Sequence, residues 1–187
     1  GADLLPVIEI RDTHGNVVTT GIDATALITL SVNTGTGSLN GTVAKQAAAG
    51  VVSFLAAQSL DFTVTGSKTL TATKADLSGG GGAGALNANS AAFTINNSAA
   101  TTLVWTTSPA NPTAAGADLL PVIEIRDTHG NVVTTGLDAT ALITLSVNTG
   151  TGSLNGTVAK QAAAGVVSFL AAQSLDFTVT GSKTLTA

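Results

Sequence analysis

One long internal repeat constrains the fold of this chain more than any other feature of its sequence. Residues 1–72 recur as residues 116–187, and the two copies differ only at Ile22, which is replaced by Leu137. The offset between the copies is 115 residues, so the 187 residues hold one full period and the first part of another. Copies this similar are expected to fold alike, which predicts two modules rather than one large domain.

The composition is that of a chain with a sizeable apolar core and a thinly charged surface. Apolar residues make up 44% of the sequence and charged residues 10%, with a net charge of −4. The 7 Lys and Arg residues are scattered and form no basic patch, which argues against a nucleic-acid partner. The absence of Cys excludes disulfides, thiolate metal ligands and a cysteine nucleophile. No apolar run reaches transmembrane length, so no membrane insertion of this segment is expected.

Apolar and polar residues alternate along nearly every apolar segment, which predicts half-buried β-strands. The Ala-rich stretch 44–62 departs from this pattern; we expect strand there, with a helical turn as the alternative. Short strands separated by turn signals, such as Asn40-Gly41, predict an all-β sandwich. The alternating segments are 7–12, 26–33, 60–65, 68–73, 91–96 and 101–107.

The segment Leu77–Ala91 has the least regular pattern of the period. It contains four consecutive glycines, Gly79–Gly82, which lose much conformational entropy when they become ordered. The segment is predicted to be either a linker between modules or a long loop within one. Its place directly before the alternating segment 91–96 favours the loop.

The order of these segments resembles the bacterial Ig-like repeats of invasin, intimin and giant repeat adhesins. An apolar strand that ends at a proline, LVWTTSP at 103–109, is followed by VIEIRDTHGN at 122–131. The segments GTGSLNG, GVVSF and KTLTA then follow in the family's order, and the resemblance covers essentially the whole period. It implies tandem Ig-like β-sandwich modules in a secreted protein, at the bacterial cell surface or in the extracellular space.

When the chain is aligned to this family pattern, the module boundaries do not coincide with the ends of the printed sequence. Residues 1–97 correspond to an Ig-like module without its first strand, and residues 98–187 to one without its last strand. Each module is expected to have an unpaired sheet edge that a neighbouring copy would cover. We therefore interpret the chain as a segment of a longer array.

The DTHGN motif at Asp12–Asn16, repeated at Asp127–Asn131, is the best-defined candidate site. Asp, Gly and Asn in this order are typical of a structural turn. The alternative is a calcium site, but calcium takes about 6–8 oxygen ligands and the motif offers one carboxylate. His14 and His129 have no second His or Cys in their modules, so we expect exposed turn residues rather than metal ligands.

Glu9 and Glu124 raise a second alternative, the catalysis of a Lys–Asn isopeptide cross-link. This reaction needs a buried acid with a shifted pKa. Glu9 falls on the same strand face as Arg11, which is predicted to face solvent, and no Lys lies in a clearly apolar run. The isopeptide alternative is therefore disfavoured.

The remaining candidate residues also have structural interpretations. Trp105, the only Trp, is expected in the core rather than in a sugar-binding platform. Thr69, Thr71 and Thr73 are expected to be ordinary outward residues of a strand rather than an ice-binding face. The sequence has no G-x-S-x-G elbow and no P-loop, so an enzyme is not expected. No catalytic, cofactor-binding or metal-binding residue is assigned.

These inferences favour a structural, non-catalytic repeat module of an extended cell-surface or extracellular rod or fibre, such as an adhesin stalk. Its expected partners are neighbouring copies of the same module, within one array or joined head to tail by strand complementation. The alternative is an adhesive module whose exposed loops, Leu77–Ala91 among them, contact a host receptor, matrix or glycan.

Overall fold

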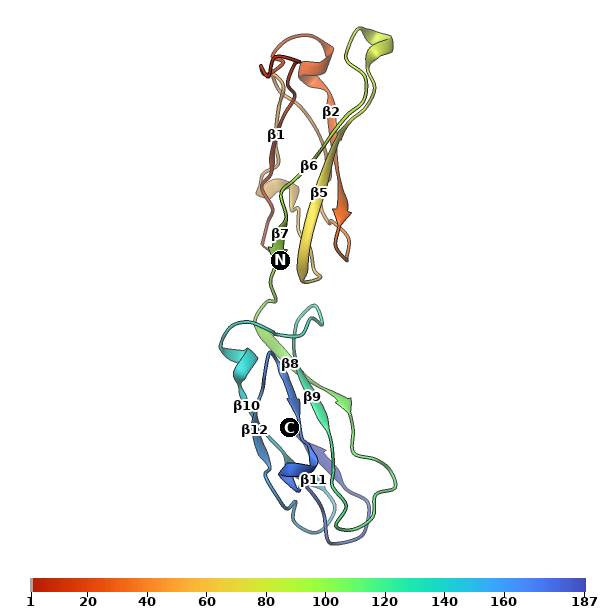
Figure 1. The fold of residues 1–187 in the computed structure, drawn as a ribbon, viewed down its shortest axis with the longest axis vertical. Coiled ribbons are helices and arrows are strands. Elements are labelled where there is room, and N and C mark those ends of the chain that lie inside the picture. The colour runs from red at the N-terminus through yellow and green to blue at the C-terminus, as the bar shows by residue number, and fades with distance from the viewer. Residues whose placement is uncertain (1) are drawn as a thin grey trace. The chain divides into compact units, whose positions relative to one another are not determined.

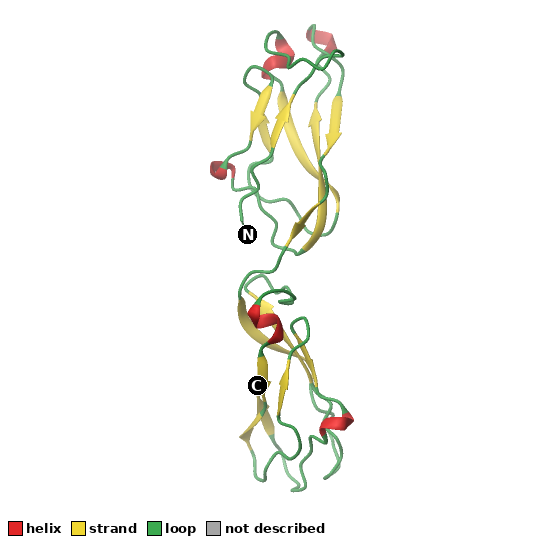
Figure 2. Ribbon diagram, turned by 60° about the vertical axis from the view of Figure 1, so that its left-hand side comes forward, coloured by secondary structure: helices red, strands yellow, loops and turns green. Residues whose placement is uncertain are grey.

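The computed structural model describes residues 2–187, which form two compact units that divide between Asn96 and Asn97. Within this range both units are all-β, and their only helices are short 3₁₀ turns (Figure 2). The predicted all-β sandwich is therefore confirmed.

The first unit, residues 2–96, is built from two groups of antiparallel strands. The larger sheet has the order β3-β2-β5-β6, β7 also pairs with β5, and β1 pairs with β4 (Figure 1). The strands are β1 (Val7–Glu9), β2 (Leu27–Thr34), β3 (Ala44–Gln46), β4 (Val51–Ser53), β5 (Gly66–Lys74), β6 (Leu86–Asn89) and β7 (Phe93–Ile95). The 3₁₀ turns are η1 (Ile22–Thr25), η2 (Ala56–Gln58) and η3 (Ser78–Gly80).

Strands β6 and β7 lie one after the other along the same edge of β5. Residues of β6 pair with Thr71–Lys74, and residues of β7 pair with Gly66–Lys68. Between them, Ser90 donates its N–H to the carbonyl of Leu70 at 2.8 Å and accepts the Leu70 N–H on its Oγ at 2.9 Å. The two short strands therefore cover nearly the whole length of β5.

The second unit, residues 97–187, is also built from antiparallel strands, but some of its strands pair with different partners than their counterparts in the first unit do. Its largest sheet has the order β13-β9-β8, and β10 pairs with β12 and β11 with β14. The strands are β8 (Ala100–Thr107), β9 (Val122–Asp127), β10 (Leu142–Thr144), β11 (Ser146–Thr149), β12 (Ala159–Gln161), β13 (Val166–Ser168) and β14 (Thr184–Thr186). The 3₁₀ turns are η4 (Leu137–Thr140) and η5 (Ala171–Gln173).

Each unit has its own hydrophobic core, made of corresponding residues of the two copies. The first core includes Ile10, Ala26, Ile28, Leu30, Ala47, Val52, Phe54 and Leu60. The second includes Leu119, Ile123, Ile125, Val133, Ile143, Leu145, Ala162, Val167, Phe169 and Leu175. The alternation predicted for 7–12 and 26–33 is thus confirmed, since Ile10, Ile28 and Leu30 are buried while Glu9 and Thr29 are exposed.

The two copies differ because the segment 73–115 occurs only once in the printed sequence. Its first part, 73–96, supplies β6 and β7 to the first unit, and its second part supplies β8 to the second unit. Where a neighbour is present, the same residues form a longer strand. With β8 beside it, β9 has 6 residues, whereas the identical sequence in the first unit forms the 3-residue β1. β5, with β6 and β7 beside it, has 9 residues against 3 in β14, but its last two residues, Thr73 and Lys74, have no counterpart in the printed sequence.

Two predictions for individual segments need correction. The predicted strand at 60–65 is absent: Leu60 and Phe62 are buried, but the backbone bridge between Asp61 and Asn40 is an isolated one outside any strand. The alternation of apolar and polar residues predicts which side chains are buried, but it does not show that another strand lies alongside to pair with the backbone. The predicted loop Leu77–Ala91 contains strand β6, whose four residues are all exposed although Leu86 and Ala88 alternate with asparagines. The Ala-rich stretch 44–62 holds both expected forms, strands β3 and β4 and the 3₁₀ turn η2.

Candidate functional site

The DTHGN motif forms the predicted turn in both units. The Asp12 Oδ1 atom accepts the backbone N–H groups of His14 and Asn16, both at 2.9 Å. Gly15 adopts φ +85°, a conformation that favours glycine. Asn16 Nδ2 donates to Asp12 Oδ2 at 3.1 Å, and the corresponding bonds recur at Asp127.

Hydrogen bonds to the carboxylates of these turns lower their pKa. For Asp12, the side-chain amide of Asn16 is the main cause, with the backbone N–H groups of the turn adding to it. For Asp127, burial raises the pKa, but the hydrogen bonds from Asn131, Ser98 and His129 together outweigh it and leave it lowered. The charged form of each Asp is therefore the one that holds the turn.

In the second unit, the turn also binds the segment that leads into β8. The Ser98 N–H donates to Asp127 Oδ2 at 3.0 Å. One residue earlier, Asn97 Oδ1 accepts the backbone N–H groups of Thr134 and Thr135, both at 3.1 Å. The repeated motif thus anchors an incoming chain segment, a role that the sequence did not predict.

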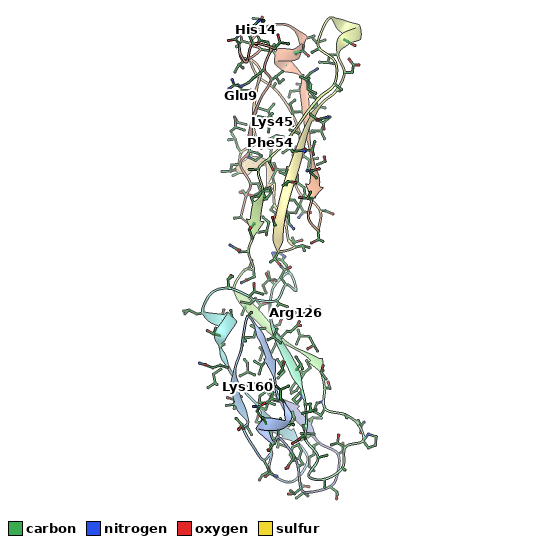
Figure 3. All side chains as sticks on the ribbon, in the orientation of Figure 1. Glu9, His14, Lys45, Phe54, Arg126 and Lys160 are labelled. Atoms are coloured by element: carbon green, nitrogen blue, oxygen red, sulfur yellow. The ribbon has the colours of Figure 1, made fainter. Side chains whose placement is uncertain are left out.

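Neither glutamate is fully buried: Glu9 is exposed and Glu124 is half-buried, and each is paired with an arginine. Arg11 donates Nε–H to Glu9 Oε2 at 2.9 Å and an Nη1–H group to the carbonyl of Gly15 at 2.7 Å. Glu124 and Arg126 repeat the ion pair, with an Nη2–Oε2 distance of 2.6 Å. Glu9, His14 and Arg126 are labelled in Figure 3, and both His14 and His129 are exposed in their turns.

The glycine-rich loop of the first unit is tied down by a buried lysine. Lys74 is buried and forms an ion pair with Asp23 at 2.9 Å, while its Nζ also donates to the carbonyls of Ala75 and Ala83, both at 3.0 Å. Asp23 Oδ2 accepts the Ala83 N–H at 2.7 Å; this bond, followed by Lys74, lowers the pKa of Asp23. Leu77–Ala91 is thus an ordered hairpin of its own unit, folded against η1 (Figure 1).

A second buried lysine was also missed by the sequence analysis. Lys68 is 0% exposed, donates to the carbonyl of Thr36 at 2.7 Å and lies 5.0 Å from the ring centre of Phe62. Phe93 of β7 packs on Phe62 with ring centres 6.2 Å apart. Lys is rarely buried, so composition alone gives no signal for this arrangement.

The corresponding surface of the second unit is an open groove of about 750 Å³. Phe177 and Lys183, the counterparts of Phe62 and Lys68, are half-buried there, and Trp105 and Leu185 contribute to the lining. Trp105 was expected in the core, but it is only half-buried: it packs against the second core and also lines this groove.

The threonine row of β5 is bonded to its neighbours. Thr71 Oγ1 donates to Asn89 Oδ1 at 2.7 Å, and Thr69 Oγ1 accepts Asn33 Nδ2 at 3.0 Å. These hydroxyl groups therefore link adjacent strands across the face of the sheet.

Among residues 2–187, no group of three or more His, Asp or Glu side chains gathers in a way that would hold a metal ion. None of the helices described is long and apolar enough to cross a membrane. Comparison with protein-family models, with curated proteins and with solved structures finds no match for this chain.

Proposed function

We propose that this chain is a structural, non-catalytic repeat segment of an extended extracellular or cell-surface protein, in which Ig-like modules follow one another along one polypeptide. The observation that carries the proposal is the near-identity of residues 1–72 and 116–187, which form two units with separate cores of corresponding residues. Repeating a module without change is useful in a protein whose function is to span a distance, because each added period contributes the same fold.

The candidate residues support a structural role over a chemical one. The Asp of the repeated motif is used by the turn itself and by the segment that enters the module. Both glutamates form ion pairs with arginine and neither is fully buried, so they lack the burial that an acid catalyst of isopeptide formation needs.

The test is mechanical. A polypeptide of eight 115-residue periods, pulled from both ends by atomic force microscopy, should unfold in equal steps. Each step should lengthen the chain by somewhat less than the extended length of one period, which is about 400 Å. Steps of unequal length, or extension without resolved force peaks, would contradict the role of a uniform load-bearing module.

An adhesive role is the second proposal, and it is favoured by the exposed hairpin of the first unit. Residues Ser78–Gly81 of its tip are exposed while Lys74 and Asp23 hold its base. A rigid base below an exposed tip is a common design of binding loops. Replacing Ser78–Gly81 with other small residues should abolish adhesion to host cells without unfolding if the loop binds, and should leave it unchanged if the module is a spacer.

A further inference from the structure

One edge of β1 in the first unit has no partner strand among residues 2–187. On its other edge, β1 pairs with β4 through Val7↔Ser53, Ile8↔Val52 and Glu9↔Val51. The open edge borders a groove of about 560 Å³ lined by residues of β1, β2, β5 and β6. Val7 is 62% exposed there, and Ile8 is half-buried.

The second unit shows what covers this edge, because it has the same sequence at the corresponding positions. There β8 pairs with β9 through Leu103↔Ile125, Val104↔Glu124 and Trp105↔Ile123. With β8 in place, Ile123 is 0% exposed, whereas its counterpart Ile8 is half-buried. The edge of β1 therefore has the shape and the backbone groups for one specific strand.

The polar anchors of that strand are also present in the first unit. The acceptor Asp127 and the donors Thr134 and Thr135, which bind Ser98 and Asn97, correspond to Asp12, Thr19 and Thr20. All three counterparts are exposed. Asp12 is already charged and oriented by its own turn, with its Oδ2 atom bonded only to the Asn16 side chain among the bonds described for it.

We propose that the open edge of β1 is a strand-docking site, and that its partner is a strand with the sequence of Asn97–Thr107 from another repeat of this type. This names the partner of the proposed fibre module and rests on that function for its biological meaning. The docked strand runs antiparallel to β1, with its Leu103 opposite Ile10 and its Trp105 opposite Ile8. Its Ser98 N–H donates to Asp12 Oδ2.

Within residues 1–187 the donor strand, Asn97–Thr107, occurs once and its acceptor edge, of identical sequence in both copies, occurs twice. Exchange of β8 between two copies fills one edge and empties another, so it adds no strand pairing. Only an additional donor strand gains the new contacts.

The experiment adds that donor as a synthetic peptide, NSAATTLVWTT, to the 187-residue protein. We expect saturable one-to-one binding by titration calorimetry and slower amide hydrogen exchange at 7–12, with the amides of β9 unchanged. A peptide with Ser98→Pro lacks the anchoring N–H and should bind about tenfold more weakly. A scrambled peptide controls for non-specific β-pairing.

Matched protein variants locate the site. Asp12→Ala should weaken peptide binding, whereas Asp127→Ala, which removes the same anchor from the second unit, should leave peptide affinity unchanged. Absence of binding, equal binding of the scrambled peptide, or new protection only in β9 would overturn the docking proposal. Equal unfolding steps of the eight-period polypeptide would persist in that case, so this failure differs from a failure of the proposed function.

Discussion

Gly156 has a conformation and surroundings that only glycine satisfies. Its φ is +84°, and a Cβ atom there would overlap the carbonyl oxygen of Ser174. Gly130 in the repeated turn has a similar φ of +81°, but a Cβ there would meet nothing within 4 Å. Substitution at Gly130 therefore tests backbone strain alone, whereas substitution at Gly156 tests strain together with steric overlap.

We expect Gly130→Ala to cost about 1 kcal/mol, the strain of a left-handed conformation, and Gly156→Ala to cost about 3 kcal/mol because overlap adds to the strain. Urea unfolding followed by the fluorescence of Trp105, which packs on the second core, measures both. Equal losses for the two variants would show that the carbonyl of Ser174 moves aside easily.

The Asp127 carboxylate makes the stability of the second unit depend on pH. Its folded-state pKa lies below the ordinary value of 3.8, so its stabilising effect is fully present above that value and is lost as the pH falls through the lower folded-state pKa. Asp127→Asn should lower the urea midpoint at pH 7 and should lose less stability than the unaltered protein between pH 6 and pH 3. Parallel pH profiles of the two proteins would contradict this account.

At the scale of elements, the glycine-rich hairpin depends on Asp23. In the second unit the corresponding Asp138 accepts only a longer bond from the Ala100 N–H, at 3.3 Å, among the bonds described for it. Asp23→Ala should therefore speed amide hydrogen exchange at Gly82 and Ala83, whose N–H groups bond to Leu77 and Asp23. Asp138→Ala is the matched control and should leave exchange in the hairpin unchanged.

Among residues 2–187, β14 has no counterpart of β7 beside it, and adding one should stabilise the second unit. Extending the chain after Ala187 with a copy of residues 73–96 would place a second Phe93 on Phe177, as Phe93 packs on Phe62. Partial burial of the added Phe and Ile should stabilise the unit by about 2 kcal/mol. The Trp105 unfolding curve measures the gain, and the same extension with Asp in place of Phe should lose most of it.

At the scale of the whole molecule, strand counting argues against spontaneous polymerisation. Exchange of β8 or β7 between copies adds no net pairing, and Glu9 and Arg11 place charges beside the open edge of β1, which discourages edge-to-edge association. The 187-residue chain should therefore have the mass of a monomer, 18.2 kDa, by light scattering. Filaments with a regular axial repeat in electron micrographs would show that the copies complete one another after all.

The periodic pattern of the sequence predicts which side chains are buried more reliably than it predicts strands. Ile28 and Leu30 were correctly placed in the core, and so were Leu60 and Phe62, although no strand forms at 60–65. Burial follows from the free energy of removing apolar side chains from water, which is a property of each residue. A strand also needs a second backbone, and the local sequence does not reveal whether one is present.

The candidate site likewise has features that the local sequence predicts and features that depend on distant segments. The DTHGN turn was predictable because all its bonds lie within five residues, whereas the anchoring of Ser98 and the burial of Lys68 and Lys74 join segments far apart in the sequence.

The sequence by itself therefore determined the all-β class, the two copies, most core side chains and the local turns, since these depend on composition, alternation and short-range hydrogen bonds. Only the tertiary structure decided how long each strand is and which residues pair across the sheet. Identical residues form a 3-residue β1 and a 6-residue β9 because β8 lies beside only one of them. The physical reason is that a strand extends as far as a neighbouring backbone satisfies its N–H and C=O groups.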